Sequence, residues 1–414
     1  MSERRETRSI GPDERRARLA VRHRLAGSAR AGTAEEVAGA LVALHATDPA
    51  TVFLAAGARL AAGRDPVAEV ERALYEERTL TRMHGMRHTV FVVPSVLAAV
   101  VHSSTADAAS ARERATLVRH LAAGSDYDEA WLAETERQVL AELAARGEAT
   151  GTELGAAVPR LRAQFVYGVG TNQEGPQSVS SRILRVLGME GRIARGRPQG
   201  GWTSSRFRWS LLPAHEDLPP AEARAELVRH WLAAYGPATE ADLKWWTGWK
   251  VTDVRRALAA LEAEPVALEE GPGFVLPDDL EPVPPLDEPW AALLPALDPT
   301  AMGWQSRDWY LDPAHRAPLF DRSGNIGPTV WWNGRIVGGW AQRADGEIVW
   351  RLFSDADVDA GAGRGNGPAA GLGTGLGKDA VRAVEAEAAR LAAWVGDVRV
   401  TPRFRTPLER ELSA

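Results

Sequence analysis

The sequence contains no cysteine among its 414 residues, and lysine occurs only three times. Without cysteine, a disulfide framework, a thiolate nucleophile and a cysteine-ligated zinc or iron–sulfur site are all excluded. No apolar run approaches the roughly 18 residues that a membrane span needs. The charged first residues contain no apolar core of a secretory signal. We therefore expect a cytoplasmic protein that does not enter a membrane.

Basic residues are fewer than acidic residues overall, 49 against 55, but they are concentrated in two stretches. The net charge of −6 excludes a uniformly basic surface for nucleic acid. Residues 1–30 nevertheless carry nine arginines against four carboxylates, and residues 178–210 carry seven arginines against one. Because the distribution of charge matters more than its sum, these stretches are the candidates for contact with DNA.

One order of elements occurs three times along the chain. Apolar residues at helical spacing predict helices in 13–25, 33–44 and 49–60, with Thr33 and Asp48 as caps, and two β-like runs follow in 78–93. The same order, three helices and then a hairpin, recurs over 125–209 and over 221–276. It is the order of a winged helix, and its recurrence predicts a repeat architecture. The expected domains are 1–124, 125–215, 216–280 and 281–414.

The last domain differs from the repeats. A proline-rich stretch, 277–289, is typical of a linker. Beyond it β-like runs alternate with turns, among them Asn333-Gly334, so we expect a small, barrel-like β domain closed by a helix in 378–396. The Gly- and Ala-rich stretch 359–377 has the spacing of neither a P-loop nor a dinucleotide fingerprint, and it predicts a flexible loop. The expected fold class is α+β.

The stretch "LHATDP", residues 44–49, places two polar side chains between two helices. An imidazole at His45 would accept a proton from a water, and the Thr47 hydroxyl would orient the same water. Side chains two residues apart point the same way only in extended or turn structure, which a break before an Asp48 cap supplies. The simpler alternative is that His45 caps the preceding helix and Thr47 supports the turn.

Longer stretches carry a family resemblance. The chain resembles the AlkZ-like tandem winged-helix DNA glycosylases, typified by the azinomycin-resistance glycosylase of actinomycetes. Over about residues 14–410, the likeness rests on "LVALHATDP", "LTRMHGMRHTVFVVP", "LRVLGMEGRIARGRPQGGWTSSRFRW", "WLAAYGPATEADLKWWTG", "LLPALDPTAMGWQSRDWYL" and "TVWWNGRIVGGW". The later stretches, which contain Trp and Gly at characteristic positions, are the more specific part of this resemblance.

The resemblance implies a fold and a reaction. Three winged-helix units would form a concave channel for a DNA duplex, and the enzyme would cut the N-glycosidic bond of a bulky N7-alkylguanine. The family's Gln–hydrophobic–Gln or Gln–hydrophobic–Asp motif, which activates the water, falls at "LHATDP". His45 and Thr47 occupy its two polar places, so this chain departs from the pattern twice. Asp48 joins the catalytic candidates either as a plain cap or as a carboxylate that holds the His45 ring.

Contacts to DNA are expected from two other stretches. Arg87 and His88 lie in the stretch that the family places beside the motif, although an ordinary polar strand face is an equal alternative. The predicted hairpin 192–209 and the helix before it are basic, and a solvated basic ribbon is the alternative there. The candidates in this second stretch are Arg182, Arg185, Arg192, Arg195, Arg197, Trp202, Arg206 and Arg208, with Trp202 expected near the hairpin tip to stack or wedge.

The reading that follows is a monofunctional, monomeric DNA glycosylase acting on double-stranded DNA without metal or other cofactor, in self-resistance to a genotoxic metabolite or in alkylation repair. No lysine lies near the motif to form a Schiff base for a lyase step. His84 and His88 flank Gly85 in a β-like run, which disfavours a metal site. Two alternatives remain: a non-catalytic winged-helix DNA binder, acting as lesion sensor or regulator, and an interaction scaffold built on the Trp-rich C-terminal half.

Overall fold

The computed structural model describes residues 7–214, 216–353 and 376–414, and its mixed α/β fold divides into two compact units. The first unit joins Met1–Ala73 to Val228–Ala414, and the second is Leu74–Leu227. The domain boundaries expected from the sequence, at 124, 215 and 280, were drawn from the repeated order of elements and not from compactness, and they stay a prediction. No helix in the described ranges is long and apolar enough to cross a membrane.

Four helices open the first unit. Their bounds are Pro12–Arg22 (α1), Ala34–Ala40 (α2), Pro49–Gly57 (α3) and Pro66–Glu71 (α4). The predicted caps are confirmed: Thr33 Oγ1 accepts a hydrogen bond from the Glu36 N–H, and Asp48 Oδ1 accepts one from the Ala50 N–H. The second helix ends earlier than its periodicity predicts, because Val42 adopts a left-handed φ of 62° and turns the chain.

The second unit begins with the predicted hairpin. Strands β2 (Leu80–His84) and β3 (Val90–Pro94) pair antiparallel on either side of Gly85. Helical structure then continues after Pro94, as expected, through α5 (Ala98–Val101) and α6 (Asp107–Gly124).

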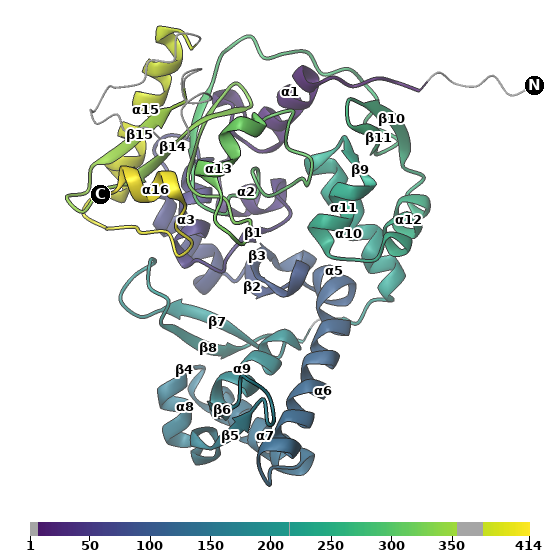
Figure 1. Cartoon of the computed structure of the whole chain (residues 1–414), viewed down its shortest axis with the longest axis vertical. Helices are drawn as coiled ribbons and strands as arrows, with labels where there is room; N and C mark the ends of the chain where they lie inside the picture. The colour runs from purple at the N-terminus through teal and green to yellow at the C-terminus, as the bar shows by residue number, and fades with distance from the viewer. Residues whose placement is uncertain (1–6, 215, 354–375) are drawn as a thin grey trace, which may run out of the picture. The chain divides into compact units, whose positions relative to one another are not determined.

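Two stretches of the chain share one order and one pairing scheme. The earlier stretch runs α7 (Glu129–Arg146), β4 (Glu148–Thr150), α8 (Gly151–Ala157), α9 (Val179–Met189), β7 (Ile193–Pro198) and β8 (Phe207–Leu211). The later stretch runs α10 (Pro220–Tyr235), β9 (Ala238–Thr239), α11 (Glu240–Thr247), α12 (Val251–Ala260), β10 (Glu264–Leu268) and β11 (Gly271–Val275). In each, the short first strand pairs with the last strand of the hairpin, giving the orders β4-β8-β7 and β9-β11-β10 (Figure 1).

The same local chemistry begins the second helix of both stretches. Thr150 and Thr239 each accept a hydrogen bond from a backbone N–H three residues on, and the carboxylate at that position accepts one from the threonine's own N–H. This reciprocal capping box fixes the helix start directly after the strand. The repeated elements predicted from the sequence are therefore confirmed in these two stretches.

A compact aliphatic core holds the earlier stretch together. On α7 the buried residues Leu132, Val139 and Leu143 are seven and four residues apart, which places them on one face of the helix. They pack with Ile183 and Leu187 of α9, and these side chains are at most 1% exposed. The packing fixes α9 against α7 and leaves the polar face of α9 outward.

One hairpin was not predicted. Strands β5 (Gln164–Tyr167) and β6 (Gly175–Ser178) pair between α8 and α9. Gly124, at the end of α6, permits this, because a Cβ there would lie 2.0 Å from the Val166 carbonyl oxygen. Periodicity in the sequence did not reveal these strands because each is only four residues long and β6, Gly-Pro-Gln-Ser, has no alternation of apolar and polar residues.

The C-terminal part of the first unit is an open sheet rather than the expected barrel. Its antiparallel strands are β12 (Ala291–Leu294), β13 (Thr329–Trp332), β14 (Arg335–Gln342) and β15 (Ile348–Leu352), in that order. In the described chain β12 and β15 do not pair, so the barrel-like expectation was wrong. The turn at Asn333-Gly334 is confirmed, with φ of 45° and 80°.

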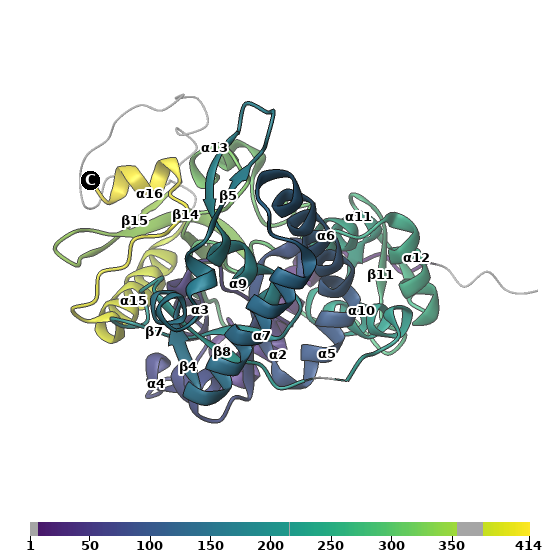
Figure 2. The ribbon, with the colours of Figure 1, turned by 90° about the horizontal axis from the view of Figure 1, so that it is seen from below.

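Helices flank this sheet. They are α13 (Arg316–Leu319), α15 (Lys378–Val395), which was expected, and α16 (Pro407–Leu412), which was not. Figure 2 shows α15 and α16 on the two sides of β14 and β15. The Gly- and Ala-rich stretch 359–377 lies outside the described residues except for its last two.

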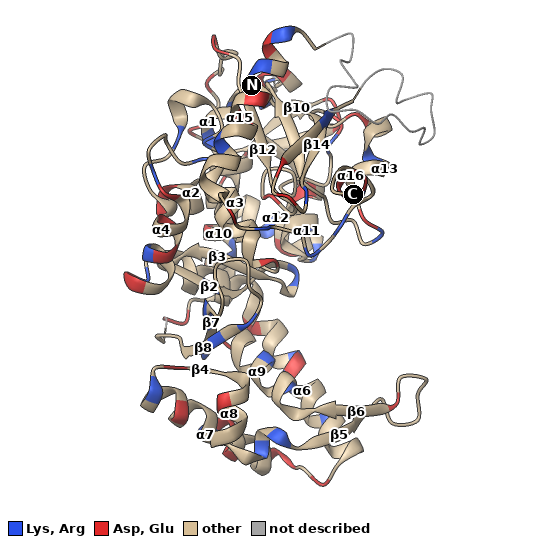
Figure 3. Ribbon diagram, turned by 90° about the vertical axis from the view of Figure 1, so that its left-hand side faces the viewer, with Lys and Arg blue, Asp and Glu red and all other residues tan. Residues whose placement is uncertain are grey.

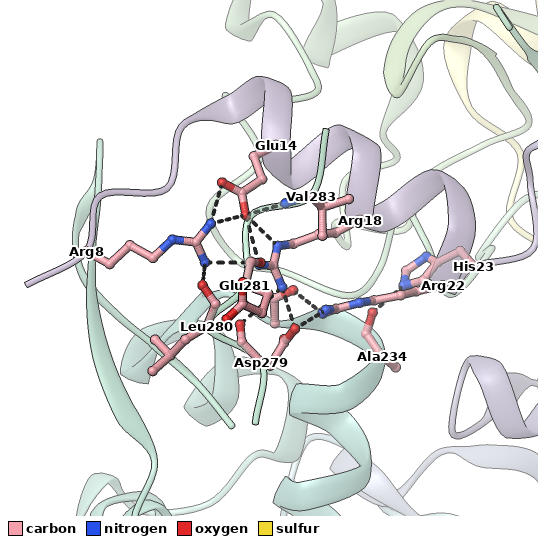
Figure 4. Close-up of polar contacts among 11 residues, drawn as sticks. Arg8, Glu14, Arg18, Arg22, His23, Ala234, Asp279, Leu280, Glu281 and Val283 are labelled. Carbon is pink, nitrogen blue, oxygen red and sulfur yellow. Dashed lines mark hydrogen bonds and ion pairs between the residues drawn. The ribbon is translucent and has the colours of Figure 1, made fainter. Parts of the chain in front are cut away.

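The basic face of α1 is internal, so its arginines are not available to DNA as the concentration of charge in 1–30 had suggested. Arg18 is 1% exposed and donates to Glu14 and to the carbonyl of Glu281 at 2.8 and 2.7 Å (Figure 4). Arg8 and Arg22 bind the same segment, through the Leu280 carbonyl and the Asp279 carboxylate. These arginines therefore fix the proline-rich stretch 277–289 onto α1, and it is not a free linker.

A buried ion pair ties α3 to the C-terminal region. Arg59 and Asp298 are both fully buried, and two guanidinium nitrogens donate to the two carboxylate oxygens at 2.9 and 2.7 Å. The remaining donors reach the carbonyls of His23 and Ala55 and the hydroxyl of Thr300. All five guanidinium N–H groups are thus used.

We expect Asp298→Asn to destabilise the protein by about 3–5 kcal/mol, because it leaves a buried guanidinium without its counter-charge. The measurement is the denaturant midpoint followed by tryptophan fluorescence. Arg255→Gln, which breaks an exposed pair with Glu240, serves as the control and should leave the midpoint nearly unchanged. An unchanged midpoint in Asp298→Asn would contradict the assigned role of the pair.

Candidate active site and DNA-binding surface

The segment between α2 and α3 is not helical. His45 lies in β1 (Leu44–His45), and residues 46–48 have no regular structure before α3 begins. This agrees with the expected break, which allows side chains two residues apart to share a direction. The His45 side chain is largely buried, at 7% exposure, so it does not stand on an open surface.

Thr47 brings a buried hydroxyl to this segment. Its Oγ1 has no hydrogen-bond partner among the residues that the structure describes. Leaving a buried hydroxyl unsatisfied is unfavourable, so a water or a ligand atom is the natural partner. The position suits a residue that orients a bound water.

Asp48 acts as a helix cap and as a link to the C-terminal segment. Its Oδ1 accepts from the Ala50 N–H at 3.1 Å, and its Oδ2 accepts from the Arg403 N–H at 2.8 Å. Burial raises the pKa of Asp48, against the two backbone hydrogen bonds that favour its charged form. Both carboxylate oxygens are engaged by backbone, which favours the cap over a direct part in chemistry.

A small cavity lies beside Asp48. Its volume is about 10 Å³, room for about one water. Its wall includes Thr51, whose hydroxyl donates to the Ala296 carbonyl at 3.0 Å. A nucleobase does not fit in this cavity.

Arg87 and His88 form a strained turn at the end of the β2–β3 hairpin. Both have left-handed φ values, 52° and 59°, and the Thr89 N–H donates to the Met86 carbonyl at 3.1 Å. Two consecutive left-handed residues favour Asn-Gly, and each larger residue costs of order 1 kcal/mol. Strain of this kind concentrates at functional sites, so this observation favours a functional role for the exposed His88 over an ordinary polar strand face.

Most arginines of α9 and of the β7–β8 hairpin already have partners. Carboxylates within 4.0 Å serve Arg185, Arg192, Arg197 and Arg208. Arg182 lies over the Tyr167 ring and donates to Gln177, and Arg195 lies over Phe207 and Trp209. Figure 3 shows arginine and carboxylate positions interspersed on this unit, so its positive field is weaker than the sequence count implies.

Arg206 and Trp202 differ from these residues in opposite ways. The side chain of Arg206 is exposed, with no carboxylate partner among the described residues. Trp202 is only 7% exposed, so its ring is not presented at the hairpin tip for stacking, as the sequence had suggested. Arg206 is therefore the most available cation of the hairpin.

The two groups of predicted residues lie in different compact units. His45, Thr47 and Asp48 belong to the first unit, and the ten DNA-contact candidates all belong to the second. Among the residues that the structure describes, no group of His, Asp and Glu side chains is arranged to hold a metal ion.

Sequence reasoning missed two features of the second unit. The loop of the β5–β6 hairpin presents Val169 at 50% exposure and projects from its helices (Figure 3). Arg82, in contrast, is buried at 3% exposure in the middle of β2. The signal for Arg82 was its position two residues after Leu80, on the same inward face of the strand.

Comparison with known proteins assigns the chain to a family. A profile described as "DNA glycosylase AlkZ-like" matches residues 38–394. The interstrand DNA cross-link repair glycosylase of Streptomyces sahachiroi is 27% identical over 237 residues, which are 54% of this chain and 57% of the relative. The solved structure of the S. sahachiroi DNA glycosylase AlkZ matches with a TM-score of 0.68 at 22% identity, covers 95% of this chain and 99% of that chain, and so shares the fold. Because the profile spans most of the sequence, the chain belongs to the AlkZ-like DNA glycosylase family.

Proposed function

We propose that this chain is a monofunctional DNA glycosylase that hydrolyses the N-glycosidic bond of bulky N7-alkylguanine in duplex DNA. It acts as a monomer in the cytoplasm and uses neither metal nor other cofactor. Repair of interstrand cross-links, named for the S. sahachiroi relative, is one setting for this activity, and self-resistance to a DNA-alkylating metabolite is another. The observation that carries the proposal is the buried, unsatisfied Thr47 hydroxyl at the family's motif position.

The pairing scheme of the two similar stretches supports winged-helix units as the DNA-binding framework. In each, three helices precede a hairpin, and the short strand between the first two helices completes its sheet. A winged helix places its third helix in a groove and its hairpin beside the backbone. In the earlier stretch these elements are α9 and the β7–β8 hairpin, which carry seven of the ten DNA-contact candidates, and Arg192 directly precedes β7.

The chemistry needs little from the protein beyond a placed water. Alkylation at N7 makes guanine cationic, so the base leaves without being protonated. The water oxygen forms a bond to C1′ while the bond from C1′ to N9 breaks. The electron pair of the broken bond stays with the departing base and neutralises its charge. His45 accepts the water's proton, and Thr47 accepts or donates the hydrogen bond that holds the water. Asp48 fixes the segment by capping α3.

We expect His45→Ala to lower the rate of base release by about 10²- to 10⁴-fold, the usual contribution of a general base. The substrate is a duplex with one bulky N7-alkylguanine, and alkali cleavage reveals the abasic product. Thr47→Val keeps the shape but removes the hydroxyl, and it should cost roughly fivefold, the value of about one hydrogen bond.

DNA affinity, measured in parallel, separates catalysis from binding. If the wild type releases the base and His45→Ala does not, while its affinity for DNA is unchanged, catalysis is assigned to His45. No release from several N7 adducts, with tight binding kept, would instead make the protein a non-catalytic DNA binder and His45-Ala46-Thr47 a turn. If the wild-type protein shows no affinity for DNA, the interaction scaffold becomes the favoured alternative.

Replacing Arg206 and Arg208 separately tests the hairpin. Arg206→Ala should weaken duplex binding and lower the slope of log affinity against log salt by about 0.9, since one phosphate contact is lost. Arg208→Ala should have a smaller effect, because Glu148 and Glu153 already compensate its charge. Equal slopes for both variants and the wild type, measured by fluorescence anisotropy between low and moderate salt, would exclude this hairpin from phosphate contact.

A further inference from the structure

The second unit contains a buried arginine whose guanidinium nitrogens have no acceptor among the residues that the structure describes. Arg82 is 3% exposed, and its Nε, Nη1 and Nη2 have no hydrogen-bond partner among the described residues. Arg59, which is fully buried in the first unit, uses every donor. A buried guanidinium without acceptors is strongly unfavourable, so Arg82 calls for an explanation beyond packing.

A cavity adjoins Arg82. It has a volume of about 210 Å³, many times that of the cavity beside Asp48 and room for a group of waters or a tetrahedral oxyanion. Its wall includes three arginines, Arg78, Arg82 and Arg195, and no aspartate or glutamate. The Tyr75 hydroxyl at the same cavity is also buried without a partner among the described residues. Every charged group of the wall is therefore positive.

The surroundings leave the Arg82 guanidinium able to turn into this space. Its Cζ lies 5.0 Å from the centre of the Phe207 ring, and that of Arg195 lies 5.4 Å from the same ring. Ring stacking holds the Arg82 head, and no hydrogen bond has to break for it to rotate. Strands β2 and β7 lie beside each other here (Figure 1), and the β7–β8 pairing slips between Arg195 and Pro198. A bulge of this kind re-aims the side chains around it.

We propose that this cavity binds a phosphate-type oxyanion, with Arg82 and Arg195 as its cations and Tyr75 as a hydroxyl donor. The guanidinium fork matches a tetrahedral oxyanion, which offers acceptors to several donors at once. In the working protein the source is a backbone phosphate of DNA, held where the β2–β3 hairpin meets the β7–β8 hairpin. Only this choice of source rests on the proposed function; the oxyanion site itself does not.

The test is the thermal unfolding midpoint of the full chain in inorganic phosphate and in chloride at matched ionic strength and pH. Phosphate raises midpoints in general through exclusion, so the comparison with variants decides. Arg82→Met should unfold at a higher temperature than the wild type in chloride, because it removes an uncompensated buried charge. It should also lose most of the additional rise in phosphate. Tyr75→Phe should reduce that rise, and Arg255→Met, an exposed arginine of the first unit, should keep it.

Competition with duplex DNA identifies the source of the oxyanion. If a DNA phosphate occupies the cavity, phosphate will displace DNA beyond the effect of chloride at equal ionic strength, and Arg82→Met will lower the salt slope by about 0.9. Stabilisation through Arg82 without competition supports the same site for a free phosphate ion. An equal phosphate effect in the wild type, Arg82→Met and Tyr75→Phe would overturn the proposal. Absence of base release with the Arg82-dependent effect intact would overturn the proposed function alone.

Discussion

The buried pair of Arg59 and Asp298 is the contact on which the first unit depends. It joins the end of α3, the carbonyl at the end of α1 and the turn that follows β12 of the C-terminal sheet, which are distant in sequence. His23, packed beside it against Thr300, has a pKa well below the usual value because burial disfavours its charged form. Since α3 begins at Asp48, the pair also fixes the segment that carries His45 and Thr47.

The arginines of this protein fall into two groups, which differ in the burial of the side chain and in its hydrogen-bond partners. On α1 and at Arg59 the guanidinium groups are internal and saturated with acceptors, and they fasten separate parts of the chain together. On α9 and around the β7–β8 hairpin they are partly exposed and pair with carboxylates, as Arg185 does with Glu113 and Arg192 with Glu136. Arg82 fits neither group, because it is internal and unsatisfied.

The departure from the family motif keeps hydrogen-bonding groups at both polar places. Histidine has a donor and an acceptor where the family has glutamine, and the shorter threonine offers a hydroxyl where the family has glutamine or aspartate. Under the proposed function the leaving group is already cationic, so His45 and Thr47 would have only to place a water and accept its proton. Within the first unit, the small cavity beside Asp48 limits the space next to this segment.

Local chemistry in the sequence determined where most elements begin. The caps at Thr33 and Asp48, the Asn333-Gly334 turn and the repeated order of helices and hairpin were all predicted, because each depends on residues within a few positions. The match of the family profile is likewise a property of the sequence.

The tertiary structure alone decided which charges are internal and whether the last sheet closes. The α1 arginines and Trp202 read as surface residues, yet they are buried, because their partners or their cover come from segments far along the chain. The β5–β6 hairpin depends on a close approach at Gly124, and the Arg82 cavity on strands from two hairpins. Burial and charge compensation arise between distant segments, and no local pattern in the sequence encodes them.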